Sequence, residues 1–168
     1  FNHIGRIPFN VSGDDQNPIL DVTFDGRHIL NGDIVSAKPY VVVSLDDENP
    51  FLLMDHASDT SRFTVYLTPP SGPEKRMYFN AGGAQQMTFV PAGSDNKCKI
   101  EWNAQFPNDG TYTLRIRAWD EADNRSGSKD YRIQFEVINR QTVTSIMNYP
   151  NPFSTRTQFV FTLTGSTL

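Results

Sequence analysis

Two stretches of the chain are rich in side chains that can bind a cation through oxygen. They read DDEN at residues 46–49 and DEADN at residues 120–124. Calcium takes six to eight oxygen ligands from carboxylates and carbonyls, which the loops between strands can supply. If the two stretches lie at one pole of the fold, four carboxylates are the candidate calcium ligands: Asp46, Asp47, Asp120 and Asp123. The alternative is that these residues start turns and cap backbone amides.

Cys98, the only cysteine, is the one candidate nucleophile of a cysteine peptidase. Alternation in KCKIEW, residues 97–102, places it on one strand face with Ile100 and Trp102. A cysteine in that position is usually a small buried hydrophobe, whereas a reactive thiolate needs an activating environment. The three histidines are scattered, and no HExxH or GxSxG motif occurs. We therefore expect no catalytic residues and no enzyme activity here, and a peptidase using Cys98 is the least favoured alternative.

Trp119 is a candidate ligand-binding residue. Alternation places it on the outward face of its strand, next to Arg117, and an exposed indole ring can stack on a sugar. The other interpretation is that Trp119 packs against the loop at 47–60 or against a neighbouring domain. A glycan- or protein-binding adhesion module is therefore the alternative function.

Short strands must position these side chains. Runs of Val, Ile, Thr, Phe and Tyr alternate with polar residues, and clusters rich in Gly, Pro, Asn and Asp separate them. The strands are expected at 19–24, 40–45, 62–67, 76–79, 86–90, 97–102, 111–119, 131–138, 143–147 and 158–163. Many short strands with frequent turns predict an all-β fold, an immunoglobulin-like antiparallel β-sandwich. Only residues 51–56 are compatible with a short helix.

Residues 111–119 and 131–138 show the clearest alternation and predict a hairpin at the centre of one sheet. The side chains expected to point inward are Tyr112, Leu114, Ile116, Ala118, Tyr131, Ile133, Phe135 and Val137. The sequence NDGTY at 108–112 resembles the tyrosine corner of immunoglobulin-like domains, so we expect Tyr112 to have a structural role.

Size and charge limit the function classes. The 168 residues suffice for one domain with appendages. The net charge is −4 and no Lys/Arg cluster occurs, so we expect no nucleic-acid partner. There is no run of 18 apolar residues, so we expect no membrane insertion. Because the chain starts at Phe1 rather than Met, we expect it to be a piece of a longer protein.

Three stretches together resemble a known group of proteins: residues 20–55, GTYTLRIRAWDEADNRSG at 110–127 and NYPNPFSTRTQFVFTLTG at 148–165. They are similar to the C-terminal region of the gingipain-like cysteine peptidase family and of other surface proteins that Bacteroidetes export by the type IX secretion system. The resemblance covers residues 17–165. In such proteins an immunoglobulin-like sandwich follows the catalytic part, and a sorting domain follows the sandwich.

The resemblance implies a non-catalytic accessory module of a large exported protein, secreted or at the outer cell surface. It would act as a spacer or scaffold leading into the sorting domain, and the parent protein would be a cysteine peptidase. The expected partners are neighbouring domains of the same chain and the type IX secretion machinery. The resemblance implies no cofactor, and the two acidic loops are the only reason to consider calcium.

The expected organisation is a linker or edge segment at 1–16, a sandwich at 17–139, and a linker with the first strand of a truncated sorting domain at 140–168. YPNPF followed by a polar turn and a strand resembles the start of a type IX sorting domain or of the related flagellar-hook-cap immunoglobulin-like domain. In QFVFTL, residues 158–163, one face is strongly apolar. We expect this strand to dock on the sandwich, to pair with another copy of the chain, or to be poorly ordered.

Overall fold

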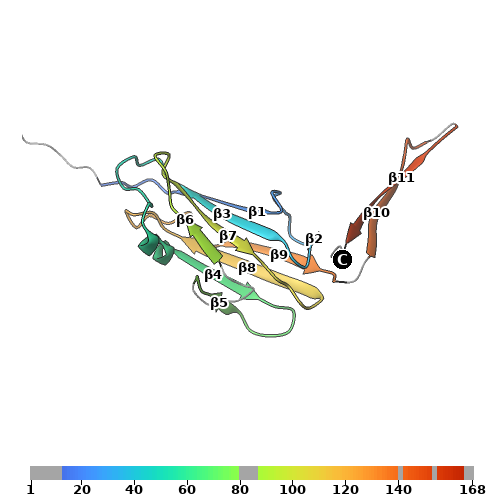
Figure 1. The fold of residues 1–168 in the computed structure, drawn as a ribbon, viewed down its shortest axis with the longest axis horizontal. Coiled ribbons are helices and arrows are strands. Elements are labelled where there is room, and N and C mark those ends of the chain that lie inside the picture. Colours follow the sequence, from blue (N-terminus) through green and yellow to red (C-terminus); the bar gives the residue numbers. More distant parts are fainter. Residues whose placement is uncertain (1–12, 80–86, 140–141, 153–154, 165–168) are drawn as a thin grey trace, which may run out of the picture.

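The chain folds into two layers of β-strands that pack face to face (Figure 1). The structure, a computed structural model, describes residues 13–79, 87–139, 142–152 and 155–164. It confirms the predicted all-β, immunoglobulin-like antiparallel β-sandwich. No helix among the described residues is long and apolar enough to cross a membrane.

The first sheet has the strand order β1-β3-β7-β6, and all its neighbouring strands are antiparallel. Its strands are β1 (Ile19–Phe24), β3 (Tyr40–Asp46), β7 (Lys97–Asn103) and β6 (Met87–Val90). The second sheet has the order β2-β9-β8-β4-β5, in which only β2 and β9 are parallel. Its strands are β2 (Asp33–Val35), β9 (Tyr131–Val137), β8 (Gly110–Ala118), β4 (Phe63–Thr68) and β5 (Lys75–Met77).

The core lies between the two sheets and is formed by the predicted inward faces. On β8 the side chains at 112, 114, 116 and 118 are buried, as are those at 133, 135 and 137 on β9, while Tyr131 is half-buried. Aromatic rings fill the centre, where Phe106 lies 5.1 Å from Phe135 and 6.0 Å from Trp102 between ring centroids. The predicted central hairpin is therefore confirmed, and its apolar face holds the two layers together.

The predicted tyrosine corner is present before β8. The Tyr112 hydroxyl donates a hydrogen bond to the Asn108 carbonyl oxygen at 3.1 Å and accepts one from the Asn108 N–H at 3.2 Å. The ring of Tyr112 is buried and stacks on Phe135. The hydroxyl thus joins the turn to the core through one side chain.

The short helix expected at residues 51–56 is absent. The side-chain oxygen of Asn49 accepts hydrogen bonds from the N–H groups of Phe51 and Leu52, and this closes a turn instead. A short 3-10 helix, η1 (Ala57–Arg62), comes next in the chain, with His56 as its N-cap. Strand β2 was not predicted because only its last residue, Val35, is buried, so the three residues show no alternation.

The last two strands, β10 (Thr142–Tyr149) and β11 (Gln158–Thr164), form a separate two-stranded antiparallel sheet. Figure 1 shows this hairpin standing away from the sandwich at the end where β9 finishes. Strand β11 therefore has a backbone partner in its own chain, which the sequence did not indicate. Its aromatic side chains still lack a core, since Phe159 and Phe161 are more than half exposed.

Candidate functional site

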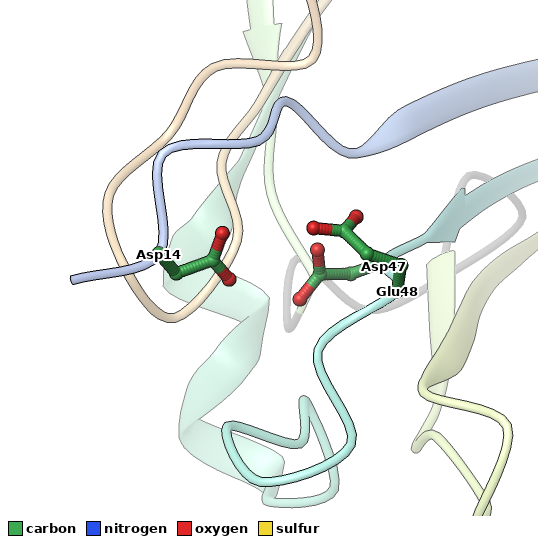
Figure 2. Close-up of side chains that lie close together, drawn as sticks. All are labelled: Asp14, Asp47 and Glu48. Carbon is green, nitrogen blue, oxygen red and sulfur yellow. The ribbon is translucent and has the colours of Figure 1, made fainter. Parts of the chain in front are cut away.

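Three carboxyl groups meet at the pole of the sandwich where the described chain enters. One oxygen of each of Asp14, Asp47 and Glu48 lies within 4.8 Å of the other two. Figure 2 shows the three carboxyl groups pointing toward one another from two segments of the chain. Asp47 is buried, Asp14 is half-buried and Glu48 is exposed. This carboxyl cluster thus reaches from the protein interior to the surface.

Asn96 fixes the orientation of Asp47. Its buried side-chain amide donates hydrogen bonds to Asp47 Oδ2 at 3.0 Å and to the Asn49 carbonyl oxygen at 2.8 Å. Its side-chain oxygen accepts a hydrogen bond from the Met54 N–H at 2.9 Å. Asn96 has φ +47°, a left-handed conformation that asparagine adopts more readily than most residues. One side chain in the turn before β7 therefore organises the whole loop after β3.

The second oxygen of Asp47 has no hydrogen-bond donor among the described residues. The pKa of Asp47 is raised to about 6, first by burial and then by the negative charges of Asp120, Glu48 and Asp14. When Asp47 is ionised, its Oδ1 is a buried anionic atom without a hydrogen-bond partner in the described chain, which is unfavourable unless a cation approaches it.

Two asparagines hold Asp14 in this cluster. The side-chain amide of Asn49 donates to Asp14 Oδ2 at 2.7 Å, and that of Asn124 donates to the Asp14 carbonyl oxygen at 3.1 Å. Asn124 also donates its backbone N–H and its side-chain amide to the buried carboxylate of Asp120. These hydrogen bonds tie together the entry segment (residues 13–18, before β1), the loop after β3 and the loop between β8 and β9.

The four predicted calcium ligands have different surroundings in the structure. Asp47 belongs to the carboxyl cluster, and the negative charge of Asp120 lies close enough to raise the pKa of Asp47. Asp46 forms an ion pair with Lys97 at 3.0 Å, and Asp123 forms one with Arg62. The structure thus brings two of the four residues together and gives the other two cationic partners.

Asp14 and Glu48 are members of the cluster that the sequence did not predict. Glu48 stands in the acidic stretch at 46–49, so composition already pointed to it. Asp14 lies in a stretch without periodicity, interpreted as a linker, although the pair Asp14-Asp15 offered a signal. Its approach to Asp47 depends on how the chain passes the pole, which no local pattern encodes.

The two other candidate residues, Trp119 and Cys98, are partly or fully buried. Trp119 is half-buried, donates its backbone N–H to the Arg62 carbonyl oxygen, and lines a shallow depression with Arg62 and Asp123. Cys98 is fully buried, with its sulfur 3.7 Å from that of Met54. Burial raises the pKa of the Cys98 thiol to about 12, so the thiol is protonated at neutral pH.

Comparison with known proteins does not place the chain in a family. No family model matches it, and no curated protein matches it. Among solved structures it is similar to the archaellum periplasmic stator protein FlaG from Sulfolobus acidocaldarius, with 16% sequence identity and a TM-score of 0.36. The match covers 70% of this chain and 99% of that chain. A similarity this distant supports no functional argument.

Proposed function

We propose that the chain is a non-catalytic spacer module of a larger exported surface protein. The observation that carries the proposal is that the described chain enters the sandwich at one end of its long axis and leaves it at the other (Figure 1). A module of this shape holds the segments on its two sides apart by its full length. The resemblance of residues 17–165 to the region after gingipain-like peptidase domains supports the exported setting and a sorting domain downstream.

The strand arrangement suits a module that carries tension. Strand β1 pairs with β3 along its whole length, from Ile19 opposite Asp46 to Phe24 opposite Val41. A force along the long axis pulls β1 parallel to its own direction, so these backbone hydrogen bonds are loaded together rather than one by one. At the other end β9 is held between β8 and β2.

The test is force spectroscopy with handles at Gly13 and Asn139. Val22→Ala shortens a buried side chain on β1, so we expect it to lower the unfolding force. Met87→Ala is the matched control, because it shortens a buried side chain on β6, at the opposite edge of the same sheet. It should lower the free energy of unfolding with little change in the unfolding force. Equal effects of the two variants on the force would contradict the proposal.

A further inference from the structure

The buried carboxylate of Asp47 has one oxygen with a hydrogen-bond partner and one without a partner among the described residues. Oδ2 accepts a hydrogen bond from Asn96, while Oδ1 has no donor among the described residues although the residue is only 2% exposed. The cause is not poor packing, since Asn96 holds the carboxylate in place through a network that includes Met54 and Asn49. A buried acceptor fixed in this way and left free points to a ligand that supplies positive charge.

The groups around the Asp47 carboxylate add negative charge and so increase the need for a cation there. Glu48 and Asp14 each place a carboxylate oxygen within 4.8 Å of an oxygen of Asp47, and the charge of buried Asp120 adds to theirs. Hydrogen bonds from Asn49 and Asn124 keep Asp14 at this place. Several anionic groups converging around one buried oxygen repel one another unless a cation lies between them.

We propose that Asp14, Asp47 and Glu48 bind one calcium ion at the pole where the chain enters the sandwich. The donors are all carboxylate oxygens, which hard divalent cations prefer. Two oxygens that share an ion lie at most twice the metal–oxygen distance apart, about 4.6–5.2 Å for calcium and about 4.0–4.2 Å for magnesium. The three carboxylate oxygens lie within 4.8 Å of one another, which is inside the range that one calcium ion can span.

The site also has access to solvent. A surface depression beside the cluster is lined by Asp14, Asp15, Glu48 and Asn49. A hydrated ion enters from this side and keeps water molecules as its remaining ligands, as calcium does in open sites. The bound ion clamps the entry segment around Asp14 onto the loop after β3 and stiffens the junction at this end of the sandwich.

The test measures calcium binding and stability on the whole chain. Isothermal titration with calcium should give one ion per chain, and the melting temperature should rise steadily with the logarithm of calcium concentration and return with a chelator. Asp47→Asn keeps the acceptor for Asn96 but removes the buried charge. Without calcium this variant should melt higher than the native chain, and added calcium should no longer raise its melting temperature.

Glu48→Gln is the second variant, because it changes an exposed side chain and leaves the core intact. It should weaken calcium binding at least tenfold. Asp46→Asn, at the end of β3, and Asp123→Asn, between β8 and β9, are matched controls, since each removes a carboxylate that pairs with a cationic side chain. Both variants should bind calcium as the native chain does.

Three results would overturn the inference: no heat of binding and an unchanged melting temperature, an equal calcium response in Asp47→Asn, or an equal response to magnesium. Calcium binding at this pole is a property separate from the proposed spacer function. Its failure would leave the force measurement on β1 unaffected, so the two proposals are tested separately.

Discussion

The hydroxyl of Tyr112 both donates to and accepts from the backbone of Asn108, four residues earlier in the chain. The turn before β8 is thereby joined to a ring that stacks on Phe135 in the core. Tyr112→Phe keeps the ring and removes both hydrogen bonds, so we expect a loss of about 1 kcal/mol in the free energy of unfolding. Denaturant unfolding measures it.

The matched control is Tyr131→Phe, which removes a phenolic hydroxyl from the neighbouring strand β9 rather than from this turn. We expect it to change the free energy of unfolding less than Tyr112→Phe does. A Tyr112→Phe variant as stable as the native chain would show that the corner contributes nothing to stability.

Arg115 makes the fold sensitive to acid. Its guanidinium donates to Glu74 at 2.9 Å and to Asp130 at 2.8 Å, and it lies 4.0 Å above the ring of Tyr66. The hydrogen bond from Arg115 lowers the pKa of Glu74. Burial raises the pKa of Asp130, but the hydrogen bonds and the positive charges of Arg115 and Arg117 together lower that pKa by more, so the net shift is downward.

Both carboxylates therefore contribute stability that is present above their ordinary pKa values near 4 and is lost as the pH falls through the lowered values. Arg115→Met should cost about 1–2 kcal/mol at neutral pH through these contacts and make the loss of stability below about pH 4 shallower. Urea unfolding at a series of pH values measures both effects. Arg132 lies opposite Arg115 in the register, and its charge contributes to the lowered pKa of Glu74 less than the hydrogen bond from Arg115 does. Arg132→Met is therefore the control and should change the acid dependence less than Arg115→Met. An unchanged acid dependence in Arg115→Met would refute this role.

The hairpin of β10 and β11 is expected to drive self-association. Both of its strands carry exposed apolar side chains, and a register shift between Thr144 and Met147 breaks the regular pairing. An isolated hairpin with free edges and uncovered aromatic rings favours contact with a second copy. We expect sedimentation velocity to show a species larger than the monomer that grows with concentration.

Phe159→Ser with Phe161→Ser should shift this equilibrium to monomer without changing the melting temperature of the sandwich, because the hairpin forms its own sheet. Phe51→Ser is the control, since it removes an aromatic ring that is 89% exposed in a loop outside the hairpin. A chain that stays monomeric at every concentration would exclude the hairpin as an association surface.

Local sequence patterns were enough to predict the fold class and the inward faces of the central strands. Alternation with a period of two assigns the side chains of β8 and β9 to core or solvent, because successive residues of a strand point to opposite sides. It likewise placed Cys98 in the core and indicated the tyrosine corner at Tyr112. These are local properties, readable from one short stretch at a time.

Which carboxylates meet depends on the folded arrangement of the whole sandwich. Asp46 and Asp47 are adjacent and chemically alike, yet Asp46 lies opposite Lys97 in the register of β3 and β7 and pairs with it. Asp47 lies one residue beyond the strand and turns inward to Asn96. Asp14 reaches the same place through the path of the entry segment. Strand register and loop path arise from packing across the whole sandwich, so no composition of a single stretch could reveal them.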